Sequence, residues 1–243
     1  MKTLVIIPSR LSATRLPGKP LLKINGISII SHVFKKAENA GIGEVVVAAE
    51  DQEIVDDVKK NGGQAFLTKK THKTGTDRIY EAFVKLGKRD IDLVMNLQGD
   101  EPLMNTNDIR KLNEQMMNGK FHLGTLASKF KDKNYNQDQN VVKVITKENF
   151  DQNQFPEAKN FTRLASSDPN TYHHLGIYCY RVETLEKFVS LNQTNNEIRD
   201  KLEQLRALDN GINVNVAKAQ SAPIGVDTQD DFVAIKKIME YKS

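Results

Sequence analysis

Two arginines and a lysine occur close together near the start of the chain, within residues 9–20. This stretch reads SRLSATRLPGKP and supplies Arg10, Arg15 and Lys19 together with hydroxyl groups and a glycine. A triphosphate is held by charge-assisted donors and backbone N–H groups, and this stretch offers both. It matches neither the P-loop pattern nor the dinucleotide pattern G-x-G-x-x-G. The stretch therefore predicts phosphate binding, with a solvated basic loop as the alternative.

Acidic side chains occur in two other short segments. Residues 96–102, NLQGDEP, place an acidic pair directly after a glycine that lets the backbone come close. Such an acidic pair suits a hard cation bound together with nucleotide phosphates. Residues 224–228, IGVDT, add a second candidate carboxylate. Asp100 and Asp227 would form a sparse Mg²⁺ site completed by phosphates, substrate and water. The alternatives are a surface turn for the first segment and a helix cap for the second.

A polar segment, HKTGTDR, occupies residues 72–78 immediately before a predicted helix. Polar groups at a helix N-terminus can recognise the edge of a base or a sugar. A lone histidine such as His72 is more often a surface or capping residue, and Thr76 or Asp77 can serve simply as the helix cap. The segment is therefore a candidate for recognition of a base or a sugar, with a surface histidine and a helix cap as the alternative.

Strands and helices alternate in the first half of the chain. Buried, β-branched runs predict strands over residues 3–7, 44–49, 64–68 and 93–97. The spacing of apolar residues predicts helices over residues 28–41, 51–61 and 76–86. This alternation indicates α/β architecture with a parallel, doubly wound sheet. Ligands bind beyond the carboxyl ends of such strands, which is where the basic stretch and the acidic pair fall.

The second half of the chain is less regular. Strands are predicted over residues 123–130, 141–146, 176–180 and 213–217, the first two as a hairpin-like excursion. Helices are predicted over residues 182–190, 196–209 and 228–241. No stretch is rich enough in Pro, Gly or Ser to separate two domains, so we expect a single domain over residues 1–243.

Composition excludes several classes of protein. The formal net charge is +4, from 35 basic and 31 acidic residues, which is too small an excess to indicate nucleic acid. The N-terminal apolar run, residues 4–7, is too short for a signal peptide or a membrane span, so we expect a cytoplasmic protein without membrane association. The single cysteine, Cys179, cannot form an internal disulfide and is expected to be buried and inert.

Taken together, these segments resemble the 3-deoxy-manno-octulosonate (Kdo) cytidylyltransferase family. The family's motifs appear in order along almost the whole chain, as PSRLSATRLPGKPLL, HKTGTDR, NLQGDEP, VKVI, HLGIYCYR, LEQLRAL and GVDT. RLPGKP alone indicates only a sugar nucleotidyltransferase, whereas HLGIY with LEQLR is specific to the Kdo branch. The resemblance implies a three-layer, mostly parallel doubly wound sheet of the nucleotide-diphospho-sugar transferase type. It also implies a homodimer, with a β excursion used for dimerisation.

The resemblance further implies transfer of CMP from CTP to Kdo, giving CMP-Kdo and pyrophosphate for lipopolysaccharide biosynthesis, with Mg²⁺ as cofactor. The catalytic residues would be Arg10, Lys19 and Asp100, and the metal ligands Asp100 and Asp227. The nucleotide would be bound by Pro8, Arg10, Arg15, Lys19, His72, Thr74 and Gly75, of which Pro8, His72, Thr74 and Gly75 would line the cytosine pocket. The acidic sugar would be bound by Arg78, Gln98, Arg163, His174, Tyr178, Glu203 and Gln204, with Arg163 as the candidate for its carboxylate.

Three segments depart from the family's pattern. Ala49-Glu50 stands where the family usually carries Thr-Asp, and Asp200 stands where it carries Glu. Residues 160–169, NFTRLASSDP, lack an Ile-Pro pair and form a shorter segment. Because two of these departures lie in the sugar-binding half, 8-amino-Kdo or another acidic sugar is the alternative substrate. A nucleotidyltransferase with a different nucleotide and a binding module without catalysis are the remaining hypotheses.

Overall fold

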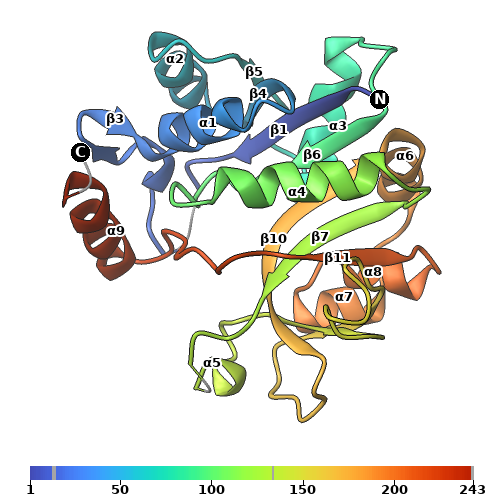
Figure 1. The fold of residues 1–243 in the computed structure, drawn as a ribbon. Coiled ribbons are helices and arrows are strands. Elements are labelled where there is room, and N and C mark those ends of the chain that lie inside the picture. Colours follow the sequence, from blue (N-terminus) through green and yellow to red (C-terminus); the bar gives the residue numbers. More distant parts are fainter. Residues whose placement is uncertain (13–14, 133, 242–243) are drawn as a thin grey trace. The chain divides into compact units, whose positions relative to one another are not determined.

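The computed structural model describes residues 1–12, 15–132 and 134–241, and these fall into two compact parts. The N-terminal part consists of Lys2–Ile91, Met95–Asn107 and Pro223–Ser243. The central part consists of Met1, Asp92–Val94 and Asp108–Ala222. Figure 1 shows the path of the chain, which leaves the N-terminal part after its blue and cyan elements and returns to it with the red C-terminal helix. A single domain over residues 1–243 stays a prediction.

Parallel strands form the centre of the N-terminal part. The strand order is β1-β4-β5, with bounds β1 (Thr3–Ser9), β4 (Gly43–Ala49) and β5 (Ala65–Leu67). In β6 (Leu93–Asn96) the chain passes from the central part back into the N-terminal part. The pairs β1–β4 and β4–β5 are both parallel. Leu4, Val5, Ile6 and Ile7 of β1 are each fully buried. Strands covered on both faces read as continuous apolar runs, so this burial explains the runs that the sequence presents.

Helices α1 (Ile29–Ala40), α2 (Gln52–Lys60) and α3 (Gly75–Leu86) connect these strands. Each buries one apolar stripe, and in α1 the stripe includes Ile29, Val33 and Ala37. The Thr74 side chain caps α3 by accepting a hydrogen bond from Asp77 N–H at 3.2 Å. The cap fixes where the HKTGT loop ends and the helix begins.

Short elements complete the N-terminal part. They are the 3-10 helix η1 (Lys19–Leu21), the strands β2 (Lys23–Ile24) and β3 (Ile27–Ser28), and the closing helix α9 (Gln229–Tyr241). Figure 1 shows α9 near the β2–β3 hairpin, and α9 contacts β2. Pro20 lies within the first turn of η1, where its missing N–H costs nothing, so η1 holds Lys19 on a rigid turn.

Strands of both directions meet in the central part. Their bounds are β7 (Leu123–Ser128), β8 (Lys143–Thr146), β9 (Ala158–Thr162), β10 (Thr171–Arg181) and β11 (Val214–Lys218). Strand β7 pairs in parallel with β11 and antiparallel with β10. Strand β8 lies antiparallel between β10 and β9. The helices are α4 (Thr106–Met117), α5 (Asn134–Gln137), α6 (Val182–Ser190), α7 (Asn195–Asp200) and α8 (Leu205–Asp209).

The α/β class and the parallel arrangement expected for the first half are confirmed, whereas two details of the second half are wrong. The predicted hairpin of residues 123–130 with 141–146 does not form, because the long strand β10 separates these partners and pairs with each of them. The predicted helix over residues 196–209 is two helices, because Lys201 adopts a left-handed backbone with φ of 53° between them. The use of a β excursion for dimerisation stays a prediction.

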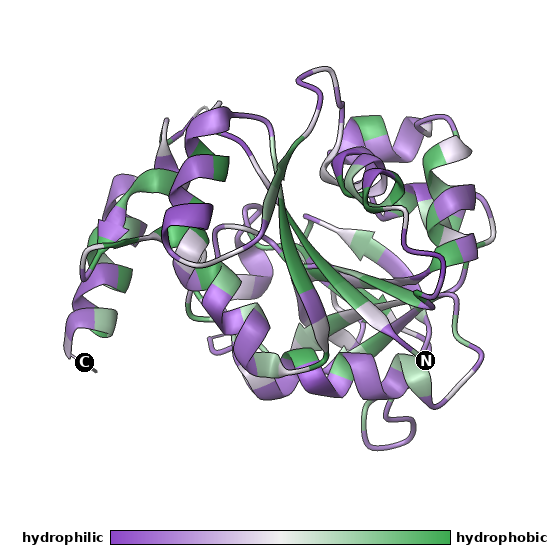
Figure 2. Cartoon of the chain, turned by 90° about the horizontal axis from the view of Figure 1, so that it is seen from above, coloured by the Kyte–Doolittle hydropathy of each residue, from purple (hydrophilic) through white to green (hydrophobic). Residues whose placement is uncertain are grey.

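The distribution of apolar residues follows the elements. In Figure 2 the strands are largely green, and the helices show purple and green on different faces. A strand covered on both sides is apolar throughout, whereas a surface helix needs only one apolar stripe. Among the residues described, no helix combines the length and the hydropathy that a membrane crossing needs.

Candidate active site

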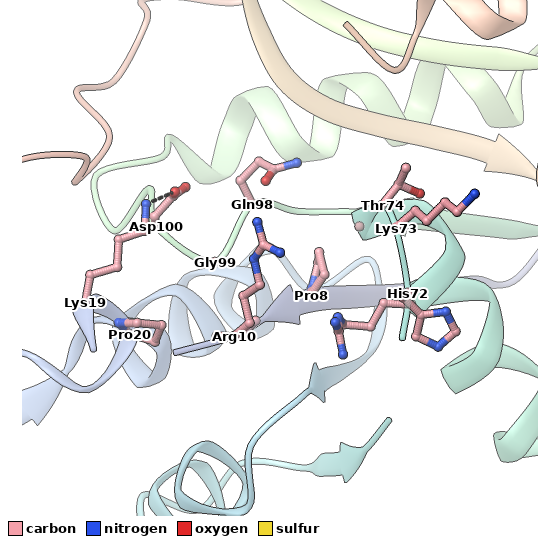
Figure 3. A pocket seen from close by; sticks show the side chains of 13 residues that line it. Pro8, Arg10, Lys19, Pro20, His72, Lys73, Thr74, Gln98, Gly99 and Asp100 are labelled. Atoms are coloured by element: carbon pink, nitrogen blue, oxygen red, sulfur yellow. Dashed lines mark hydrogen bonds and ion pairs between the residues drawn. The ribbon is translucent and has the colours of Figure 1, made fainter. Parts of the chain in front are cut away.

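A cavity of about 280 Å³ lies in the N-terminal part at the carboxyl end of β1. Its walls come from the end of β1, from η1, from the loop before α3 and from the loop after β6 (Figure 3). The residues around it are Pro8, Ser9, Arg10, Lys19, Pro20, His72, Lys73, Thr74, Gly75, Arg78, Gln98, Gly99 and Asp100. Three of the four predicted segments therefore meet in one cavity, at the end of the sheet where α/β proteins bind ligands.

Lys19 joins the cavity to the fourth segment. Its Nζ lies 2.6 Å from Asp100 Oδ2 and 3.2 Å from Asp227 Oδ1, and it donates a hydrogen bond to the Val226 carbonyl at 2.9 Å. Arg15 also pairs with Asp227, at 3.0 Å. Burial alone would lower the pKa of Lys19, but Asp100 and then Asp227 outweigh it and raise the pKa. The ammonium group therefore stays charged between the two aspartates.

Asp100 and Asp227 fit the predicted metal site in their chemistry. Both carboxylates reach the same cation, Lys19 Nζ, so they converge on one point although they are distant in sequence. Carboxylate oxygens are the ligands that Mg²⁺ prefers, and Mg²⁺ commonly takes only one or two of them beside phosphates and water. Within residues 1–12, 15–132 and 134–241, no three His, Cys, Asp or Glu side chains are grouped to hold a metal.

Glu101, the second residue of the acidic pair, is a further site residue to which the sequence pattern gave no role of its own. Its Oε2 atom is buried and accepts no hydrogen bond from any described residue. Burial, followed by the charges of Asp100 and Asp227, raises the pKa of Glu101 to about 8. Two adjacent acidic residues in a sequence do not reveal which of the two carboxylates turns inward. The inward orientation of Glu101 therefore could not be predicted from the sequence.

Gly99 lets the loop after β6 come close to the end of β1. A Cβ added at Gly99 would lie 3.0 Å from the Pro8 carbonyl oxygen and 3.1 Å from Ile30 Cδ1. Both distances are shorter than ordinary van der Waals contact, so a larger residue would push the loop outward. The prediction that this glycine allows close backbone approach is confirmed.

Four residues that were predicted to line a base pocket are brought together. Pro8, His72, Thr74 and Gly75 all line the cavity, and Pro8 Cγ lies 3.6 Å from where a Gly75 Cβ would stand. In the view of Figure 3, Arg10 lies between the Lys19–Asp100 pair and the loop that carries His72 and Thr74. The cavity thus has an acidic and cationic end, an arginine in the middle, and a polar loop at the other end.

Arg78 and Gln98, both predicted to bind the sugar, line this same cavity. The Arg78 guanidinium is buried and donates to Thr68 Oγ1 at 2.6 Å, to the Lys69 carbonyl at 3.1 Å and to Glu50 Oε2 at 2.6 Å. Glu50 is one of the departures from the family's pattern, and here it neutralises Arg78. The structure thus groups Arg78 and Gln98 with the nucleotide candidates, while the remaining five sugar candidates lie in the central part.

His174, Tyr178 and Glu203 lie close together in the central part. His174 Nε2 is 3.0 Å from the Thr125 hydroxyl, and the rings of His174 and Tyr178 are 5.6 Å apart. Burial lowers the pKa of His174 to about 3, so its ring is neutral near pH 7. Burial, then Tyr180 and Glu203, raises the pKa of Tyr178 well above its ordinary value. His174 and Tyr178 are therefore both neutral hydrogen-bonding groups near pH 7.

The LEQLR segment is held by a buried ion pair. Arg206 Nη2 lies 2.5 Å from Glu197 Oε1, and its guanidinium stacks over the Phe188 ring at 4.7 Å. Gln204, a predicted sugar ligand, is buried at the start of α8. The pair fixes the turn that carries Glu203 and Gln204.

Arg163 lies beside a different cavity. Its Nε donates to the Asp200 carbonyl at 3.1 Å, and one terminal nitrogen donates to the Gln139 carbonyl at 3.3 Å. It lines a cavity of about 910 Å³ that β9, α7 and α8 enclose, which neither His174 nor Tyr178 lines. The structure thus does not gather all the predicted sugar ligands of the central part around one cavity.

Cys179 behaves as expected. Its side chain is fully buried in β10. Burial raises the pKa of the thiol to about 12, so the thiolate needed for reactivity does not form near neutral pH.

Comparison with known proteins agrees with these features. The family model described as Cytidylyltransferase matches residues 4–218. A 3-deoxy-manno-octulosonate cytidylyltransferase of Rhodopseudomonas palustris (strain BisB18) is 41% identical over 243 residues, 99% of this chain and 98% of that protein. A CMP:2-keto-3-deoxy-manno-octonic acid synthetase solved in complex with CTP superposes with a TM-score of 0.90 at 32% identity, over 100% of both chains. A 4-diphosphocytidyl-2C-methyl-D-erythritol synthase of Anaerococcus prevotii, at TM-score 0.66 and 15% identity over 98% of both chains, shares the fold.

Proposed function

Because this chain belongs to the cytidylyltransferase family, we propose that it transfers CMP from CTP to Kdo, giving CMP-Kdo and pyrophosphate. One observation carries the proposal. Arg10, Lys19 and Asp100 converge on one cavity in a chain that superposes along its whole length on a synthetase solved with CTP. Kdo is a component of lipopolysaccharide, so the product would serve lipopolysaccharide biosynthesis.

The reaction is an in-line displacement at phosphorus. The anomeric hydroxyl of the sugar forms a bond to the α-phosphate of CTP, the bond from that phosphorus to the bridging oxygen breaks, and the hydroxyl proton is lost. Arg10, Arg15 and Lys19 would hold the triphosphate and neutralise the charge that grows on the departing pyrophosphate. Such a reaction depends on positioning and charge neutralisation more than on covalent chemistry by the protein.

Asp100 and Asp227 would hold Mg²⁺. When bound there, Mg²⁺ would neutralise phosphate charge and lower the pKa of the attacking hydroxyl. Lys19, which contacts both carboxylates, would then exchange them for phosphate oxygens. The ammonium group holds the two aspartates together in this structure.

The base would be recognised by the loop at the other end of the cavity. Pro8, His72, Thr74 and Gly75 would surround cytosine, and polar groups there would reject bases that leave them unpaired. Arg10, which lies between this loop and the Lys19–Asp100 pair in Figure 3, is suitably placed for the phosphates.

The residues proposed for the acidic sugar are Arg78, Gln98, Arg163, His174, Tyr178, Glu203 and Gln204. A second acceptor, 8-amino-Kdo or another acidic sugar, is favoured by one observation. Arg163, the candidate for the sugar carboxylate, lies in the altered segment 160–169. Its guanidinium already donates hydrogen bonds to the backbone carbonyls of Asp200 and Gln139. Recognition of the carboxylate would have to use the rest of its guanidinium.

Pyrophosphate release tests the proposal. The chain is incubated with CTP and Mg²⁺ and with Kdo, 8-amino-Kdo or a sialic acid as acceptor. Release with Kdo and not with the other two is expected. Release with another sugar alone would keep the mechanism and change the substrate. Silence with all three would contradict the proposed function.

We also propose that the protein acts as a homodimer in the cytoplasm, bound to neither nucleic acid nor membrane. The net charge of +4 is too small an excess to indicate nucleic acid. Light scattering after size exclusion, with a mass near twice 27.4 kDa expected, tests the dimer.

A further inference from the structure

A carboxylate behind the nucleotide cavity plays no part in the proposed chemistry. Glu81 lies on α3, with a side chain only 13% exposed. Its Oε2 accepts a hydrogen bond from Lys69 N–H at 2.9 Å and contacts His72 Nε2. Its Oε1 pairs with Lys85 Nζ at 2.6 Å. One buried side chain thus binds the backbone at the start of a cavity loop and a side chain within it.

The loop that Glu81 holds, residues 69–74, is fixed at both ends. The Lys69 carbonyl accepts from Arg78 at 3.1 Å, so two side chains one turn apart on α3 bind both backbone groups of Lys69. At the other end, the Thr74 side chain caps α3. His72 therefore projects from a short loop whose backbone cannot shift freely.

The charge of Glu81 decides which ring nitrogen of His72 carries the proton. Burial opposes ionisation, but hydrogen bonds from Lys85, His72 and Lys69 outweigh it and lower the pKa of Glu81 to about 2. An ionised carboxylate only accepts hydrogen bonds, so the His72 nitrogen that faces it, Nε2, must carry a proton. In a neutral imidazole the other nitrogen, Nδ1, is then an acceptor.

We propose that Glu81 is a positioning residue for base recognition, fixing His72 in the Nε2–H tautomer so that Nδ1 is offered as an acceptor to a nucleotide base. The inference rests on the proposed function, in which His72 lines the cytosine pocket. The exocyclic amino group at C4 of cytosine donates, whereas the carbonyl at C4 of uracil accepts. An acceptor on His72 therefore favours CTP and opposes UTP, because two facing acceptors leave each other unpaired.

Nucleotide binding by the intact chain tests this assignment. The dissociation constants for CTP and UTP are measured by calorimetry for the wild type, Glu81→Gln, His72→Ala and the double variant. The amide introduced by Glu81→Gln can donate to Nε2 and so permits the other tautomer, which makes Nδ1 a donor. We expect the preference for CTP over UTP to fall by about tenfold in Glu81→Gln, through weaker CTP binding. His72→Ala should lose the same preference without touching α3.

The control and the double variant show whether Glu81 acts through His72. Glu53→Gln makes the same substitution at an exposed position of α2 and should leave the preference unchanged. In the His72→Ala background, Glu81→Gln should add no further change. An unchanged preference in Glu81→Gln or in His72→Ala, or a further loss in the double variant, would overturn the inference. A wild type that binds CTP in preference to UTP but transfers nothing to any sugar would contradict the proposed function alone.

Discussion

Lys19 and Asp100 form an ion pair, with 2.6 Å between Nζ and Oδ2, although 81 positions separate them in the chain. Lys19 is held by the rigid turn η1, and Asp100 follows the close approach of Gly99 to the end of β1. The ion pair therefore forms because these two local structures meet at the carboxyl end of the sheet. Because Asp227 contacts the same nitrogen, a change at Lys19 should alter both the chemistry and the neighbouring carboxylates.

Replacing Lys19 should remove catalysis without unfolding the protein. Lys19→Ala deletes a donor aimed at the departing phosphates, and we expect kcat/KM for CTP to fall by roughly a hundredfold to a thousandfold. Steady-state pyrophosphate release measures the loss. Lys23→Ala, an exposed lysine on β2, is the matched control and should retain wild-type activity. Full activity in Lys19→Ala would remove the role assigned to it.

Removing either candidate metal ligand should weaken the response to Mg²⁺. Asp100→Asn and Asp227→Asn keep the shape of the side chain but lose the charge that attracts a hard cation. The wild type should gain thermal stability when Mg²⁺ and CTP are added together, and each variant should gain less. Asp56→Asn, on the exposed face of α2, should behave as the wild type. Wild-type Mg²⁺ dependence in both site variants would contradict the assignment.

Adding one methyl group at Gly99 should strain the wall of the cavity. In Gly99→Ala the new Cβ meets the Pro8 carbonyl oxygen at 3.0 Å and Ile30 Cδ1 at 3.1 Å. Such overpacking costs about 1–3 kcal/mol, and here it would also displace the loop that carries Asp100. Urea denaturation and the KM for CTP together report the two effects.

Gly225→Ala provides the comparison, because its Cβ would lie 3.7 Å from Glu101 Cγ, an ordinary contact. We expect Gly225→Ala to cost less stability than Gly99→Ala. Equal stability of the two variants would show that the loop after β6 moves more easily than this packing implies.

Acid should destabilise the chain through His174. Burial lowers the pKa of His174 to about 3, whereas an unfolded histidine titrates near 6.5. The unfolded chain binds more protons between these values, so stability is retained above about pH 6.5 and is lost as the pH falls toward 3. At pH 5 this group alone costs about 2 kcal/mol relative to pH 8. Urea midpoints at the two pH values measure the difference.

His174→Gln should reduce that pH dependence. His173, whose pKa is lowered to about 4 by burial and by Lys131 and Lys143, should account for part of what remains. His122→Gln, at an exposed position, should leave the full dependence in place. If His174→Gln loses as much stability in acid as the wild type, the buried neutral state of His174 is wrong.

The nucleotide side of the site could be predicted because its groups lie in short contiguous motifs at strand ends. The run that forms β1 places the basic stretch, and the glycine before Asp100 marks a close backbone approach, so topology alone brings them together. The partners of the motifs could not be predicted in the same way. Glu50 meets Arg78 and Glu81 meets His72 through packing of α3 against the loops, which leaves no fixed spacing in the sequence.

The central part was harder to predict for a different physical reason. Lys201 takes a left-handed backbone with no glycine, asparagine or proline to mark it, so a continuous helix fitted the apolar spacing equally well. Strand β10 is long enough to pair with β8 through its first residues and with β7 through the rest. A local sequence pattern does not reveal that one strand pairs with two others. For the same reason, the positions of the sugar-binding candidates on these elements could not be predicted.

The central claim is that this chain joins CMP to Kdo, and the most direct test is to identify the product. Wild-type protein is incubated with CTP, Mg²⁺ and Kdo, and the mixture is followed by phosphorus NMR and mass spectrometry, with Lys19→Ala in parallel. We predict CMP-Kdo and pyrophosphate in equal amounts from the wild type and neither from Lys19→Ala within the same time. CTP that remains intact, or pyrophosphate that appears without CMP-Kdo, would contradict the account.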